Sequence, residues 1–224
     1  MPQPSPDPKL IVAGDDWGAS PRYNAGILEA ARAGAIDSAS AMVLRPCCDP
    51  GDLLETGIEI GLHLELPPDL AEDAVAAEPG RQAALFERLF GRPPAYLDGH
   101  HHCHAAEPLA SAVEKLVLAL EVPVRPVGEA HAQRLRRQGI ASPDRLVGRV
   151  DPGQPVLPDE IAAALDGHGL PDGITEWVVH PGHRDPAHGS SYDEEREEDL
   201  ALLLELAAEP ALAPARVSHR EALA

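Results

Sequence analysis

The chain has 224 residues, a length that suits one large α/β domain or two small ones, and we favour one. Its formal net charge is −19, so it repels phosphate backbones and anionic membrane surfaces; neither nucleic acid nor a membrane is an expected partner. Because only 3% of the residues are aromatic and 24 are proline, we expect an aliphatic core and stiff loops.

The cysteines and the N-terminus indicate a cytoplasmic protein. Cys47 and Cys48 are adjacent and Cys103 lies in a histidine cluster, so the three form no disulfide framework. Residues 1–8 contain four prolines and no apolar segment of the secretory kind, and no run of eighteen apolar residues follows. We expect an N-terminal tail over 1–8 and a single domain over 9–224.

In the first half of the chain, apolar runs and helical spacing alternate. Residues 9–13 predict a buried strand that ends at Asp15 and Asp16. Ser20 and Pro21 then predict the start of a helix that Gly34 ends. Further strands are predicted over 40–44 and 57–64, and a helix over 81–90 leads to a strand that begins near Tyr96.

The second half continues the alternation with one weak region. A helix is predicted over 107–120, and a strand over 122–127 despite its prolines. Residues 128–173 give no confident order, although the basic run 134–137 is typical of a solvated helix face. A strand over 175–179, a helix over 193–208 and a last short strand from Val217 complete the pattern.

This alternation predicts a (β/α) barrel of about seven or eight parallel strands, closed or partly closed, with its site at the carboxyl ends of the strands. Polar residues stand at or near those ends. They are Asp15, Asp16, His63, the cluster from His100, Arg125 and His180. Each alone is compatible with a capping or hydrogen-bonded loop role, but together they indicate one site.

The cluster over 98–104 reads Asp-Gly-His-His-His-Cys-His. On a strand, Asp98, His100, His102 and His104 would share one face, and His101 and Cys103 the other. Neutral imidazole is the commonest side-chain ligand of transition metals, so the cluster indicates a bound divalent ion. An expression tag is a poor alternative because the cluster is internal and interrupted by cysteine; a solvated polar turn is the other.

At these motifs the chain resembles the YdjC/ChbG-like carbohydrate deacetylases. The matching segments are residues 11–18, 24–27, 61–64, 91–94, 97–102, 123–125 and 176–182. The departures, at Gly14, Gly99, Cys103 and Val179, are small and fall on no expected ligand.

The resemblance implies a distorted (β/α) barrel related to the polysaccharide deacetylases, with one divalent ion, magnesium or zinc, bound to Asp16, His63 and His100. It also implies that Asp15 is a free carboxylate beside the ion. Two histidines and one carboxylate leave positions open for water and substrate, and Asp15 would take the proton of the attacking water.

The remaining candidates are assigned around that centre. His180 is the candidate proton donor to the leaving amine, and Arg125 the candidate partner that keeps Asp15 ionised; a loop histidine and a surface salt bridge are the alternatives. Asp98, His101, His102 and His104 are expected to support the ligands or contact substrate. His183, His188 and Tyr192 are expected at the mouth of the site, and His131, His168 and His219 are expected to be exposed.

The expected function is therefore removal of acetyl groups from N-acetylated sugars, with a small carbohydrate as the partner. A metal-dependent phosphoesterase or amidohydrolase is the alternative enzyme, although Arg125 is the one arginine found near the motifs and phosphoryl sites gather several. A metal-binding or sugar-binding relative without turnover is the alternative outside enzymes. The oligomeric state is left open, a homo-oligomer included.

Overall fold

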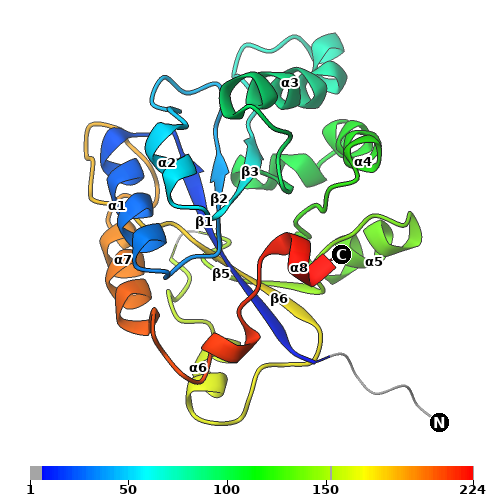
Figure 1. The fold of residues 1–224 in the computed structure, drawn as a ribbon. Coiled ribbons are helices and arrows are strands. Elements are labelled where there is room, and N and C mark those ends of the chain that lie inside the picture. The colour runs from blue at the N-terminus through cyan, green and yellow to red at the C-terminus, as the bar shows by residue number, and fades with distance from the viewer. Residues whose placement is uncertain (1–6, 152, 224) are drawn as a thin grey trace, which may run out of the picture.

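Six parallel strands form one curled sheet, an open half-barrel, at the centre of the computed structural model (Figure 1). The structure describes residues 7–151 and 153–223. The strands are β1 (Lys9–Trp17), β2 (Ser38–Ala41), β3 (Glu59–Leu64), β4 (Leu97–Gly99), β5 (Arg145–Gly148) and β6 (Ile174–Val179). Their order in the sheet is β4-β3-β2-β1-β6-β5, which places β1 between β2 and β6.

Helices surround the sheet (Figure 1). They are α1 (Pro21–Arg32), α2 (Gly51–Glu55), α3 (Glu78–Phe90), α4 (Leu109–Leu120), α5 (Glu129–Arg137), α6 (Asp159–Leu165), α7 (Glu195–Leu206) and α8 (His219–Leu223). Short 3-10 turns cover Glu72–Ala77, His100–Ala105 and Ala213–Ala215. None of the described helices is long and apolar enough to cross a membrane.

The predicted boundaries of α1 are confirmed with their causes. The Ser20 hydroxyl accepts a hydrogen bond from the Arg22 amide at 3.1 Å, and Pro21 occupies the first turn, where its missing N–H costs nothing. Gly34 follows the helix with φ of +69°, a left-handed conformation that glycine adopts without steric cost. The residues of α1 that face the sheet, such as Ile27, are fully buried.

The α/β barrel prediction is confirmed, but the strand count of seven or eight was too high. Residues 122–127 make one bridge, between Leu97 and Val124, and no strand. Pro123 and Pro126 explain this, because proline has no N–H to donate to a ladder of hydrogen bonds. The sheet therefore stays open beyond this segment, and the poorly predicted region from residue 128 supplies α5, β5 and α6. The basic run over 134–137 lies in α5, as predicted.

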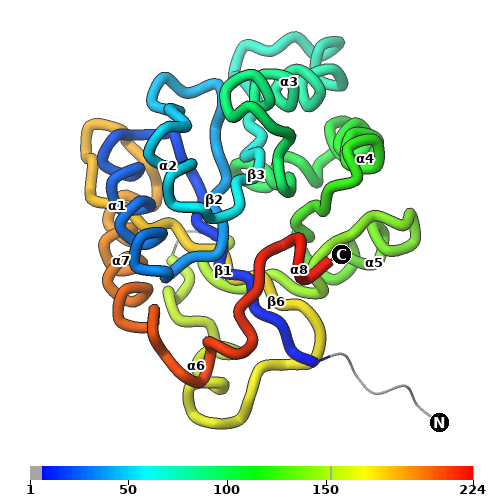
Figure 2. Tube along the Cα trace, in the orientation of Figure 1, coloured from blue at the N-terminus to red at the C-terminus, as the bar shows by residue number. Residues whose placement is uncertain are grey.

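The predicted strand from Val217 was also wrong. Arg216 makes a single bridge to Leu10, and the Val217 amide donates to the Leu10 carbonyl at 3.0 Å before α8 begins. Figure 2 shows this C-terminal segment beside the beginning of β1. His219, expected to be exposed, is buried: its ring stacks on Tyr96 with 3.7 Å between the centroids. His168 is exposed as expected, and His131 is half-buried.

The predicted tail over 1–8 lies mostly outside the described residues. The register of the sheet begins at its end, where Lys9 pairs with Ile174 of β6.

Candidate active site

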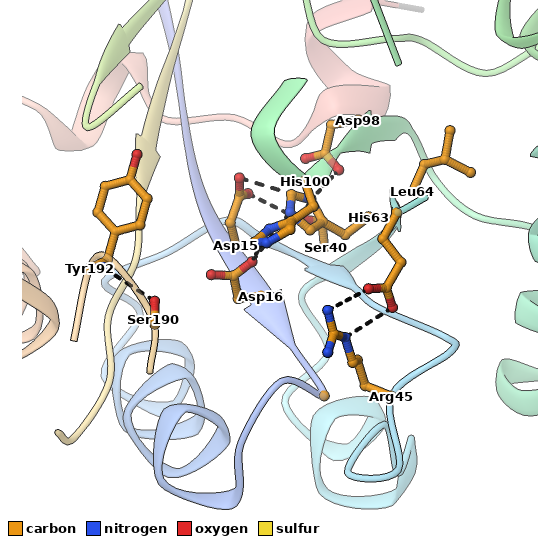
Figure 3. Close-up of polar contacts among 12 residues, drawn as sticks. Asp15, Asp16, Ser40, Arg45, His63, Leu64, Asp98, His100, Ser190 and Tyr192 are labelled. Atoms are coloured by element: carbon orange, nitrogen blue, oxygen red, sulfur yellow. Dashed lines mark hydrogen bonds and ion pairs between the residues drawn. The ribbon is translucent and has the colours of Figure 1, made fainter. Parts of the chain in front are cut away.

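Asp15, Asp16, His63 and His100, which the sequence places at strand ends, lie close together at the carboxyl ends of the strands (Figure 3). Asp15 and Asp16 lie near the end of β1, and His63 near the end of β3. His100 directly follows β4, and His180 directly follows β6. The prediction that these side chains come together from distant parts of the sequence therefore agrees with the structure.

A kink in β1 explains how two adjacent aspartates face the same site. On a regular strand their side chains would point to opposite faces of the sheet. Asp16 instead has φ of +73°, and the register with β2 shifts between Gly14 and Trp17. A left-handed conformation costs a non-glycine residue of order 1 kcal/mol or more, and such strain concentrates at functional sites.

Asp16, His63 and His100 place three ligand atoms around one point. Asp16 Oδ1 lies 3.3 Å from His63 Nε2 and 3.1 Å from His100 Nδ1. One carboxylate oxygen and two imidazole nitrogens within 4.8 Å of one another fit a divalent transition ion or magnesium. His63 Nε2 is buried and makes no hydrogen bond to the described residues, as expected of a ligand atom.

The His63 ring is held from behind by Asp98. His63 Nδ1 lies 2.7 Å from Asp98 Oδ1, so Nδ1 donates to the carboxylate and Nε2 is directed at Asp16. Burial would lower the pKa of His63, but the Asp98 and Asp15 carboxylates raise it well above the ordinary value. The pocket thus favours positive charge at this position. Asp98 was expected to orient a histidine of its own cluster; it orients His63.

Asp15 is paired with Arg125 inside the barrel. Arg125 Nη1 donates to Asp15 Oδ2 at 2.6 Å and Nη2 to Oδ1 at 2.8 Å; Ser40 also donates to Oδ1, at 3.0 Å. Burial would raise the pKa of Asp15, but the Arg125 and His63 charges hold it far below its usual range. Since both side chains are buried, the alternative of a surface salt bridge for Arg125 is wrong.

Arg125 also contacts two further buried carboxylates. Its Nη2 lies 2.8 Å from Asp98 Oδ2, and its Nε donates to Glu176 Oε1 at 2.7 Å. Asp15, His63 and Asp98 form a second group with ligand-like spacing. The guanidinium already pairs with Asp15 and Asp98 of this second group, so the first group is the better candidate metal site.

Arg196 of α7 contacts the site, and the sequence analysis did not identify it as a site residue. Its Nη2 donates to Asp16 Oδ2 at 2.5 Å, and its Cζ lies 3.8 Å above the Tyr23 ring. Burial would raise the pKa of Asp16, but the charge of Arg196, the hydrogen bond with His100 and the nearby His63 ring hold it well below the usual range. No local motif signals this role, because Arg196 stands in an acidic run that is typical of a solvated helix.

His180 faces the same small cavity as Asp15 and His63. Its ring stacks on Tyr192 with centroids 4.3 Å apart, and its backbone N–H donates to Asp199 Oδ2 at 2.7 Å. Burial lowers the pKa of His180 to about 4, and its Nδ1 makes no hydrogen bond to the described residues. A hydrogen-bonded loop histidine would not leave a buried ring nitrogen unpaired, so this geometry favours a functional role for His180 over a structural one.

The turn after His180 is positioned by close backbone packing on α1. A Cβ atom on Gly26 would lie 2.4 Å from Gly182 Cα, so only glycine lets the turn approach the helix this closely.

The histidine cluster does not continue β4 as predicted. The strand ends at Gly99, and His101 and His102 adopt φ of +49° and +56°, so the expected alternation of faces is lost. His104 turns inward and its Nε2 donates to the Arg125 carbonyl at 3.0 Å; burial lowers its pKa to about 3. His102 Nε2 donates to the Val150 carbonyl at 3.1 Å. Both rings therefore bond to backbone carbonyls around the site and are not directed at the candidate metal position.

The rim of the site is partly as predicted. His101, His188 and Tyr192 line a cavity of about 490 Å³ that opens beside Asp16. His183 does not: it lies 3.4 Å from Glu29 of α1, on the outside of the turn that follows His180.

The sequence-based prediction that Arg125 is the one arginine near the motifs was wrong, since Arg45, Arg149 and Arg196 also line the site.

Comparison with known proteins places the chain in a family. The family model described as "YdjC-like protein" matches residues 9–69 and 67–213. The chain belongs to the YdjC-like family. A carbohydrate deacetylase of Geobacillus stearothermophilus is 32% identical over 223 residues, covering 86% of this chain and 88% of the relative. A chitooligosaccharide deacetylase of Proteus mirabilis is 27% identical, covering 91% and 93%.

Solved structures share the fold of this YdjC-like chain. A putative cellobiose-phosphate cleavage protein of Enterococcus faecalis superimposes with a TM-score of 0.78 at 20% identity, covering 97% of this chain and all of the other. A peptidoglycan N-acetylglucosamine deacetylase matches with a TM-score of 0.53 at 13% identity, covering 98% and 90%. At these identities the likeness concerns the half-barrel alone.

We expect Arg125→Met to destabilise the metal-free protein by about 3–5 kcal/mol at pH 7, because it leaves three carboxylates buried without their cation. Burial would raise the pKa of Glu176, and Arg125 lowers it, so the carboxylate of the folded wild type stays ionised down to the unfolded pKa of about 4. Without Arg125, burial raises that pKa, and the folded variant takes up a proton as pH falls from 7, which relieves the cost of the buried charge. The difference between the two proteins should therefore shrink between pH 7 and pH 4. Urea unfolding across this pH range measures it.

Arg136→Met is the matched control, because Arg136 pairs with Asp144 at 2.8 Å on the surface, with side chains 47% and 38% exposed. Its loss should cost less than about 1 kcal/mol. Equal losses in the two variants would contradict the central place given to Arg125.

Proposed function

We propose that this protein is a metal-dependent hydrolase that removes acetyl groups from N-acetylated sugars of the chitooligosaccharide type, releasing acetate and a free amine. The observation that carries the proposal is the division of two adjacent aspartates. Asp16 joins two histidines in a ligand group, while Asp15 stays outside it, held by Arg125. The names of the relatives, carbohydrate deacetylase and chitooligosaccharide deacetylase, support the same activity.

Asp16, His63 and His100 would hold one divalent ion, zinc or magnesium. Such an ion would polarise the acetamide carbonyl and make water easier to ionise. The chain itself presents Asp16 Oδ1 and two imidazole nitrogens to the ion. Asp98 accepts from the other ring nitrogen of His63, and Arg196 donates to the other carboxylate oxygen of Asp16, so both ligands are held in position.

Asp15 would accept the proton of the attacking water. Its Oδ1 accepts hydrogen bonds from Arg125 and Ser40, whereas Oδ2 accepts one from Arg125, so Oδ2 retains a lone pair. The bidentate pairing keeps the carboxylate ionised and fixed in direction. A base in a fixed position contributes typically 10²–10⁴-fold to rate.

His180 would deliver a proton to the leaving amine. With a pKa lowered to about 4, its ring is neutral at neutral pH and has to gain that proton during the reaction. The proton that Asp15 takes from the attacking water can pass to the His180 ring across the small cavity that the two side chains share. Stacking on Tyr192 keeps the ring in place.

Phosphoryl transfer is less well supported, because the buried arginines of the site are already paired. Arg125 contacts three carboxylates, Arg149 contacts Asp199 and Glu198, and Arg196 contacts Asp16. Phosphoryl-transfer sites need cations free to meet the transferred group.

The proposal is tested by assaying acetate release from N-acetylated sugars after chelation and metal add-back. We expect activity to be lost on chelation and restored with a divalent ion, at one ion per chain by elemental analysis. His63→Ala or His100→Ala should lose the ion. A protein that binds no ion, or that releases no acetate from any sugar in the panel, would count against the assignment.

The two aspartates should differ when changed separately. Asp16→Ala should weaken ion binding, whereas Asp15→Asn should keep the ion and lose turnover by about 10²-fold or more. Calorimetric titration with the metal and the acetate assay read the two effects. Equal loss of the ion in both variants would mean that the pair binds it jointly; intact sugar binding with no turnover in the wild type would indicate a binding protein.

His180→Ala should retain the ion and lose amide hydrolysis by about 10²-fold or more. An amine leaves poorly unless protonated, while the phenolate of an aryl acetate leaves unaided, so any esterase activity should fall less. Comparing the two substrates measures this. Parallel losses would instead make His180 a contact to substrate or to the developing oxyanion.

A further inference from the structure

Two hollows meet at the open side of the site. The first, described above, contains Asp16, His100 and Tyr192. The second has a volume of about 470 Å³ and lies over the loops that follow β2 and β3. Both are lined by Arg45, His100 and His101, so they share one wall. Each falls within the range of about 300–1,000 Å³ that is usual for small-molecule sites.

The second hollow has an apolar lining that the catalytic proposal does not use. Leu44, Leu66, Pro67 and Pro68 contribute to it, and Leu66 is one of the few large hydrophobic side chains that are exposed, at 40%. An apolar wall with a small number of fixed polar groups is the usual make-up of a ligand site. A pyranose ring matches it, with C–H groups on its faces and oxygens around its edge.

Arg45 supplies the fixed polar group. Its Nε donates to Glu65 Oε1 at 3.1 Å and its Nη2 lies 2.6 Å from Oε2, a two-point ion pair drawn with dashed lines in Figure 3. Among the described residues its third nitrogen, Nη1, has no hydrogen-bond partner. The Arg45 side chain is 39% exposed and lines both hollows, so Nη1 is available to a ligand at the wall between them.

Buried groups hold Glu65 in turn. The Glu65 amide donates to Gln82 Oε1 at 3.2 Å, and Gln82 Nε2 donates back to the Glu65 carbonyl at 2.6 Å. Gln82 is fully buried and Glu65 nearly so. A surface arginine would ordinarily lose side-chain entropy on binding a ligand, and here the clamp has already restricted it.

We propose that the second hollow binds the sugar unit next to the one that is deacetylated, and that Arg45 donates from Nη1 to an oxygen of that neighbouring unit. The inference rests on the proposed function and adds to it a residue that selects for chain length. Because Glu65 neutralises Arg45, the clamp favours an uncharged hydroxyl or ring oxygen over an anionic substituent.

The test compares N-acetylglucosamine with its N-acetylated disaccharide in the metal-loaded enzyme. We expect the wild type to prefer the disaccharide. Arg45→Met and Leu66→Ser should each lower kcat/KM for the disaccharide about 10-fold more than for the monosaccharide, through KM. Arg45→Lys should resemble Arg45→Met, since lysine keeps the charge but cannot make the two-point clamp.

Arg81→Met is the matched control. Arg81 belongs to the same network, with its Nη2 2.6 Å from Glu78 Oε1, an atom that also accepts from Gln82, but its side chain is 54% exposed and lines neither hollow. It should leave the ratio of the two substrates unchanged.

Equal losses for both substrates in Arg45→Met would make Arg45 a structural residue. A wild type without preference for the disaccharide would mean that the second hollow does not bind a neighbouring sugar unit. Either result overturns the inference. Calorimetric binding of the disaccharide separates it from the proposed function. If no acetate is released, a roughly 10-fold weaker binding in Arg45→Met but not in Arg81→Met still supports it, and equal binding in all three proteins overturns it.

Discussion

The structure depends on one buried guanidinium. Arg125 lies in the interior of the half-barrel and contacts Asp15 of β1, Asp98 of β4 and Glu176 of β6. A buried carboxylate without a partner costs several kcal/mol, so three of them are compatible with a stable fold only because they surround this cation. The position of Arg125 is itself set by two contacts of its backbone: its amide donates to Leu97 and its carbonyl accepts from His104.

Arg125 fixes two parts of the site through two of its carboxylate partners, Asp15 and Asp98. Through Asp15 it fixes the carboxylate that we propose as the base. Through Asp98 it fixes the ring of His63, whose other nitrogen faces Asp16. The proposed ligand His63 and the proposed base Asp15 therefore both depend on the same cation for their positions. The second aspartate, Asp16, pairs with a different arginine, Arg196, and this separate pairing is consistent with the different roles that we propose for the two adjacent carboxylates.

The parts of the structure that the sequence predicted well are local. Ser20 and Pro21 begin a helix and Gly34 follows its end because capping and backbone freedom act within a few residues. Strand ends were recognisable because β1, β3 and β6 are apolar runs that finish in charged or imidazole side chains. Predictions failed where a local pattern competes with tertiary contacts. His101 and His102 leave the strand conformation, and His219, in a polar terminal segment, is buried on Tyr96.

The sequence by itself determined the α/β alternation, the strand-end position of the candidate site and the types of side chain in it, because periodicity and strand direction are local properties. The tertiary structure alone decided the pairings: Arg125 with three carboxylates, Arg196 with Asp16, Asp98 with His63, and Arg45 with Glu65. These pairs join residues 20 to 180 positions apart, and the strongest of them exist because burial removes water from charges. Which charges lose their water depends on how the sheet curls, and no short stretch of sequence records that.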